Sequence, residues 1–225
     1  MELADTQRSG RCELRLMRVQ VSPAAPINMI TESIKFIRDI SWDEIFTTWY
    51  EREGSREEWQ KVATEVKGWP DWKSWRKASA DFIEADKREW KLYEIENPNE
   101  FIPKCIIGPW KNWQKNFEEK NKHTFEDLVE MCPDWVNNNG KIQQIKNDFP
   151  DQTQFIGIYF KESDRFVIFE GTHRASAIAQ AKAEGNPINF KTNPTIAVTE
   201  FSEKEAELLK QKLERNVGTH PNKQS

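Results

Sequence analysis

The segment Phe166–Ala179 (FVIFEGTHRASAIA) contains the residues whose types and spacing are best suited to chemistry. Within it, the run EGTHR joins an apolar, strand-like stretch to an alanine-rich, helix-like stretch. A glycine at such a junction lets a ligand approach the backbone closely. A helix N-terminus presents unpaired amides with a partial positive charge, and an arginine adds a planar group suited to phosphate oxygens. The segment therefore predicts a site for phosphate or a similar anion.

The five residues of this run, here named the EGTHR corner, are expected to have different roles. Gly171, Thr172, His173 and Arg174 are predicted to bind the ligand, because positive side chains in a helix's first turn cost up to ~1 kcal/mol unless an anion is present. Glu170 and His173 are the candidate catalytic residues. Glu170 could pair with Arg174, bind Mg²⁺ beside a phosphate or act as a general base, and an ordinary strand-end ion pair is equally compatible.

Strands and helices on both sides are expected to position the corner. Two apolar runs joined by a polar turn, Phe155–Phe160 and Arg165–Phe169, predict a hairpin. Thr172 stands where a helix cap belongs. Further strands are predicted at Lys91–Glu96, Cys105–Ile107 and Thr195–Glu200, and further helices at Thr124–Met131, at Asn138–Phe149 and after the capping pattern Ser202–Glu205.

Residues 29–90 are predicted to form a Trp-rich helical region. Ser41, Ser55 and Asp71 are the expected helix caps. All ten tryptophans precede Val136. Such rings can bind sugars or bases, but their helical spacing favours a role in the core; the stretch Trp69–Trp72 is kept as a candidate contact surface.

The two ends of the chain are interpreted separately. Residues 1–28 are predicted to be a disordered or spurious extension, because they have little apolar periodicity and resemble the translation of a transfer-RNA gene; the expected start is Met29. Residues 216–225 are expected to form a flexible tail.

Composition narrows the classes of function. The chain has 225 residues, a net charge of −4 and 31% charged residues. Its apolar runs are too short to span a bilayer, so no membrane partner is expected. Nucleic acid is a partner that the charge does not favour. The three cysteines lack the spacing of a zinc site or a disulfide framework, so no metal site is predicted and a reducing cytoplasm is the expected location.

The order of these elements resembles the ParB/sulfiredoxin superfamily. The resemblance runs over roughly Leu92–Leu213 and is most specific in the strand VIFEG, the run Thr172–Arg174 and the helix after it. It implies an α+β domain over residues 91–215, a small mixed sheet with flanking helices, preceded by the helical region. Sulfiredoxins carry a cysteine where this chain has Thr172, so sulfiredoxin activity is not expected.

The EGTHR run is also similar to the D-G-H-H-R motif of free-serine kinases in that superfamily. This similarity implies nucleotide phosphate held by Gly171–Arg174, with Mg²⁺ as a companion of the nucleotide. In such a fold, Asn97 and the turn at Gly108 would lie near the motif. The resulting hypothesis is a domain that binds a nucleotide or another phosphate-bearing small molecule, with NTPase or phosphotransfer activity as one version. The alternative is a non-catalytic module for nucleic-acid or protein interaction; the oligomeric state is not predicted.

Overall fold

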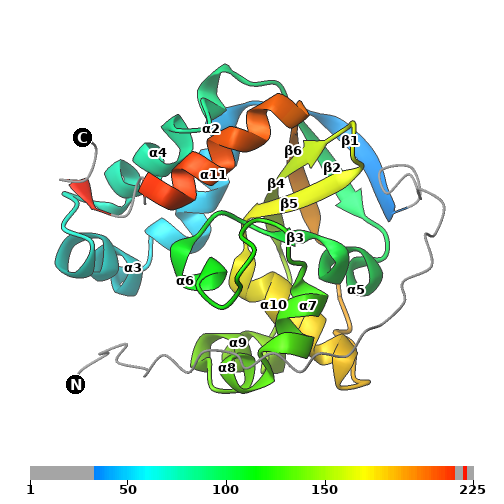
Figure 1. Cartoon of the computed structure of the whole chain (residues 1–225). Coiled ribbons are helices and arrows are strands. Elements are labelled where there is room, and N and C mark those ends of the chain that lie inside the picture. The colour runs from blue at the N-terminus through cyan, green and yellow to red at the C-terminus, as the bar shows by residue number, and fades with distance from the viewer. Residues whose placement is uncertain (1–32, 216–219, 222–225) are drawn as a thin grey trace.

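A six-stranded mixed sheet forms the centre of the computed structural model, which describes residues 33–215 and 220–221 (Figure 1). The strand order is β1-β2-β6-β4-β5-β3. Strand β4 pairs antiparallel with β5 and parallel with β6, and β3 pairs parallel with β5. The strands are β1 (Ile34–Ile40), β2 (Trp90–Ile95), β3 (Ile106–Ile107), β4 (Gln154–Phe160), β5 (Arg165–Glu170) and β6 (Thr195–Phe201).

Helices cover both faces of this sheet, so the predicted α+β class with a mixed sheet and flanking helices is confirmed. On one face lie α2 (Trp42–Trp49), α3 (Glu57–Lys61), α4 (Trp72–Asp81) and α11 (Ala206–Arg215), with short π-helical turns at Tyr50–Gly54 and Val62–Val66. The other face carries α5 (Pro98–Phe101), α7 (Phe125–Met131), α8 (Pro133–Asn137), α9 (Gly140–Asn147) and α10 (Thr172–Ala183). The short α6 spans Lys111–Gln114.

The central strands are apolar throughout because both of their faces are buried. In β5, Phe166 and Ile168 pack with α5, α7, α9 and α10, whereas Val167 and Phe169 pack with α2, α4 and α11. Such two-sided burial gives continuous apolar runs in place of simple alternation. The predicted hairpin of β4 and β5 is confirmed.

Most of the expected helix caps are present. Ser41 and Ser202 form the reciprocal contacts of a capping box, and the Asp71 side chain accepts a hydrogen bond from the Ser74 amide. The prediction for Ser55 is wrong: its hydroxyl donates to the Glu51 carbonyl, and α3 begins one residue later without a side-chain cap.

The prediction of helices throughout residues 29–90 missed strand β1. This strand forms one edge of the sheet and pairs antiparallel with β2, with a β-bulge between Phe36 and Arg38. Phe36 and Ile37 are exposed. Helices α2 and α4 share a hydrophobic cluster with β4, β5 and β6, so the Trp-rich region packs directly against the sheet. The predictions for residues 1–28, and most of those for 216–225, lie outside the described residues.

The tryptophans serve mainly as core residues. Trp49, Trp72, Trp75 and Trp90 are all buried. In the stretch Trp69–Trp72, Trp72 has no exposed surface, whereas Trp69 is half-buried and Pro70 and Asp71 are exposed, so its role as a contact surface stays a prediction. Within the residues described, no helix combines the length and apolar character needed to span a membrane.

Candidate functional site

Gly171 makes the turn between strand β5 and helix α10. Its φ of +101° lies in the left-handed region, and a Cβ built there would lie 2.4 Å from the Cδ1 atom of Phe155. Glycine is therefore required both by the backbone and by the close approach of the Phe155 ring. Thr172 was expected to cap the helix, but it is the first helical residue; Gly171 is the N-cap, and no side chain caps α10.

The N-terminus of α10 has no side-chain cap, which is what the predicted anion site requires. Because no side chain caps the helix, its first amides keep a partial positive charge. Thr172 is buried, and its carbonyl accepts a hydrogen bond from the Ser176 hydroxyl. The Thr172 side chain is thus part of the packed start of the helix, close to where a ligand would have to bind.

Arg174 already forms an ion pair with a carboxylate of the same corner, that of Glu170. The Nη2 atom of Arg174 donates to both carboxylate oxygens of Glu170, at 2.8 and 2.6 Å. Both side chains are largely buried, with 14% and 16% of their surface exposed. Burial raises the pKa of Glu170, and the charge of Arg174 opposes that shift. Of the alternatives left open for Glu170, the pair with Arg174 is the one that the structure contains.

His173 lies at the corner as a neutral side chain. Its ring contacts Trp113 edge-on, with the ring centroids 4.9 Å apart. Burial, together with the charges of Lys141 and Arg174, lowers the pKa of His173 to about 3. At neutral pH the imidazole is therefore uncharged. It can donate or accept a hydrogen bond, but it cannot act as a general acid in the imidazolium form.

The Trp-rich region brings three more charged side chains to this corner, which the sequence analysis did not select. Arg52 donates from Nη1 to the Gln154 carbonyl at 3.2 Å. Burial and the nearby Arg174 lower the pKa of Arg52 to about 10. Glu53 and Arg76 act on Glu170 from farther away: the charge of Glu53 raises the pKa of Glu170, and that of Arg76 lowers it.

Arg76 is enclosed by indole rings. Its guanidinium lies 3.9 Å from the ring centroid of Trp75 and 5.1 Å from that of Trp49. Its Nη2 atom donates to Glu53 at 2.5 Å, and Glu53 also accepts from the indole Nε1 of Trp49 at 2.5 Å. Sequence patterns did not reveal this cluster because its members come from α2, the turn after it, and α4, and only tertiary packing brings them together.

Little empty space remains beside the corner. Between α2 and the strands β4 and β5 lies a niche of about 10 Å³, lined by Ile45, Thr48, Trp49, Arg52, Gln154, Ile156 and Glu170. This volume is about the minimum that holds one water molecule. A nucleotide does not fit into it in this conformation.

The two loops expected near the motif lie in different places. The turn at Gly108 is close, because the indole Nε1 of Trp110 donates to the Phe169 carbonyl at 2.8 Å. Asn97 is not at the corner: it precedes α5, which packs at the opposite end of α10, where Lys182 forms an ion pair with Glu100 at 2.9 Å. The structure therefore separates Asn97 from the other predicted ligand-binding residues.

Two carboxylates at the corner, Glu53 and Glu170, are each paired with an arginine. No group of three metal-ligating side chains occurs within the described part of the chain. Comparison of the chain with protein-family models, with curated proteins and with solved structures gives no match.

Proposed function

We propose that the EGTHR corner binds the phosphate group of a nucleotide or of another phosphate-bearing small molecule, in a domain of the ParB/sulfiredoxin type. The observation that carries this proposal is the N-terminus of α10, which follows a left-handed glycine, has no side-chain cap and lies beside a buried arginine. A helix N-terminus with an adjacent guanidinium is a general arrangement for binding phosphate.

In this proposal the phosphate replaces the carboxylate of Glu170 as the partner of Arg174. Both are anions with two or more oxygens that can accept from the same guanidinium. Arg52 and the amides of Gly171–Arg174 supply the remaining positive charge. Since the niche is the size of one water, binding requires the Glu170–Arg174 pair to open and the side chains of α2 to shift.

If the ligand is a nucleotide, phosphoryl transfer or hydrolysis would depend on positioning and on neutralisation of charge. Glu170, once released from Arg174, is the candidate general base; its raised pKa favours that role. Neutral His173 would donate a hydrogen bond to the ligand. Any Mg²⁺ would be held mainly by the phosphates, because the carboxylates at the corner pair with arginines.

The second candidate is a non-catalytic interaction module, and the closed state of the corner favours it. In that case the Glu170–Arg174 pair is a structural contact that joins β5 to α10. A protein partner is then more consistent than nucleic acid with the net charge of −4.

Stability measurements with ligands separate the two candidates. Thermal shift is measured with inorganic phosphate, ATP and ADP, each with and without Mg²⁺. Phosphate binding predicts stabilisation by ~2.7 kcal/mol when the ligand is at a hundred times its Kd. We expect Arg174→Met to abolish the shift and Glu170→Gln to strengthen phosphate binding, because the competing carboxylate is gone.

Arg165→Met is the matched control, since Arg165 also pairs with a glutamate, Glu203, but at the other end of β5. This variant is expected to keep the full ligand shift. Absence of a shift with all of these anions would contradict phosphate binding and favour the interaction module. Loss of turnover in Glu170→Gln with retained binding would identify Glu170 as a catalytic residue.

A further inference from the structure

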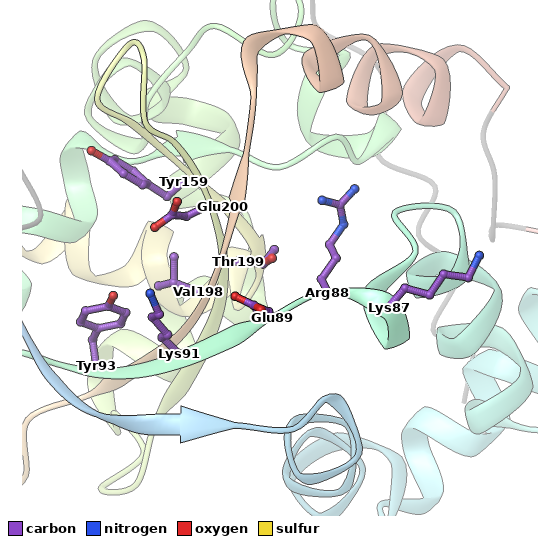
Figure 2. Close-up of a pocket in the computed structure, with 9 residues that line it drawn as sticks. All are labelled: Lys87, Arg88, Glu89, Lys91, Tyr93, Tyr159, Val198, Thr199 and Glu200. Atoms are coloured by element: carbon purple, nitrogen blue, oxygen red, sulfur yellow. The ribbon is translucent and has the colours of Figure 1, made fainter.

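A second concave site lies at the hairpin end of the sheet, away from the EGTHR corner. It is a groove of about 300 Å³, which is at the lower end of the range for small-molecule sites. Figure 2 shows the residues that line it: Lys87, Arg88, Glu89, Lys91, Tyr93, Tyr159, Val198, Thr199 and Glu200. Tyr159 lies near the β4–β5 turn, whereas Glu170 is at the opposite end of β5. The two sites share no lining residue.

The register of three strands places five of these side chains on one face. Lys91 of β2 is opposite Val198 of β6, and Tyr159 of β4 is opposite Glu200 of β6. Alternate residues of a strand share a face, so Tyr93 lies on the same side as Lys91. Figure 2 shows these five side chains following one another across the strands. Val198 is buried and forms an apolar floor.

The groove offers the ammonium group of Lys91 and the carboxylates of Glu200 and Glu89 for recognition. Within the described part of the chain, none of these three side chains takes part in an ion pair. The remaining cations point elsewhere: Arg88 bonds to Glu205, and Lys87 bonds to Glu84. Two charges of opposite sign that do not neutralise each other can each receive a ligand group of the opposite sign.

The two phenols complete the groove. The Tyr159 hydroxyl donates to Asp164 Oδ1 at 3.0 Å, which fixes that ring. The Tyr93 phenol can donate a hydrogen bond at neutral pH, and burial raises its pKa above its usual range. Aromatic rings on either side of an apolar floor favour a ligand with an apolar or aromatic part.

From this arrangement we infer that the groove binds a small zwitterion, a free α-amino acid with an apolar side chain. Its ammonium group pairs with Glu200, with Glu89 at the rim, and its carboxylate pairs with Lys91. Its side chain lies on Val198 between Tyr93 and Tyr159. This inference is independent of the phosphate site, because it uses other residues at the other end of the sheet.

The first test uses the unmodified protein and three probes. Binding of phenylalanine, of phenethylamine, which lacks the carboxylate, and of N-acetylphenylalanine, which lacks the ammonium, is measured by NMR chemical-shift titration. We expect phenylalanine to bind and each of the other two to bind at least tenfold more weakly. Equal binding of phenethylamine, or no shift with any probe, would overturn the inference.

The second test uses variants of the two charges. Glu200→Gln and Lys91→Met are each expected to weaken phenylalanine binding at least tenfold. Lys35→Met is the matched control, because Lys35 is an exposed lysine of the neighbouring strand β1 and does not line the groove. Circular dichroism checks that each variant is folded. Unchanged affinity in both groove variants would overturn the inference, even if the wild-type protein binds phenylalanine.

Discussion

At the scale of single residues, Gly171 is the position where the corner tolerates the least change. Both the φ of +101° and the contact of a built Cβ with Phe155 at 2.4 Å oppose any side chain. We expect Gly171→Ala to lower the free energy of unfolding by about 2 to 4 kcal/mol, from backbone strain plus displacement of a core ring. Chemical denaturation monitored by circular dichroism measures this.

Gly185→Ala is the control for that variant. Gly185 also has a positive φ, +72°, but a Cβ there meets no atom within 4 Å. Gly185→Ala should lower the free energy of unfolding by about 1 kcal/mol, from backbone strain alone. If the two variants lose equal stability, the contact with Phe155 is not what makes glycine necessary at position 171.

The lowered pKa of His173 predicts that the stability of the fold depends on pH. Its pKa is about 3 in the folded protein, below the ordinary 6.5, so the unfolded chain binds a proton that the folded chain does not. The contribution of His173 to the free energy of unfolding is therefore fully present above pH 6.5, and it is lost as the pH falls toward 3. Between pH 7 and pH 5 we expect a loss of about 1 to 2 kcal/mol from this residue.

The measurement compares wild type with His173→Phe, which keeps a ring beside Trp113. Denaturation at pH 7 and at pH 5 gives the change for each protein, and the contributions of the carboxylates cancel in the difference. The variant should lose less stability between the two pH values than wild type does. An identical loss in both proteins would show that His173 takes up its proton in the folded state.

At the scale of elements, the ion pair between α4 and the turn after α2 fixes the helical layer over the sheet. Arg76 and Glu53 are both nearly buried, with 12% and 13% of their side chains exposed. We expect Arg76→Met to cost about 3 to 5 kcal/mol, because Glu53 is left as a buried, unpaired charge. The double variant Arg76→Met/Glu53→Gln should be more stable than Arg76→Met alone.

Lys77→Met on the same helix is the control. Lys77 pairs with Asp81 on the exposed side, where ion pairs contribute about 0 to 1 kcal/mol. A double variant that is less stable than Arg76→Met would contradict the buried-charge explanation and point to the aromatic contacts of Arg76 instead.

Some of the elements could be predicted from the sequence, and others could not. The hairpin, the turn at Gly171 and the caps at Ser41 and Asp71 were predicted correctly, because each depends on local residue types. Strand β1 was missed because its pairing partner is β2, about fifty residues further along. The residues of the EGTHR corner were selected as a candidate site from the sequence, but Arg52 and Arg76 were not, since only the packing of the Trp-rich helices brings them near Glu170.

At the scale of the whole molecule, the Trp-rich region and the sheet form one hydrophobic cluster. Trp49 and Trp72 pack in the same cluster as Ile156 and Phe169 of the central strands. We therefore expect residues 90–215 expressed alone not to fold cooperatively, because one face of the sheet would be exposed. The test is thermal unfolding by circular dichroism, with the full chain as the control. A sharp transition in the fragment would show that the sheet folds without the helices.

The bulge in β1 affects how two molecules in solution can meet. A regular edge strand with exposed apolar side chains offers a template on which a strand of another molecule can add, and such addition leads to aggregation. Here the irregularity between Phe36 and Arg38 interrupts the row of backbone donors and acceptors, and charged Lys35 and Asp39 flank it. The bulge and the flanking charges thus make the addition of a further strand beside the exposed Phe36 and Ile37 less favourable.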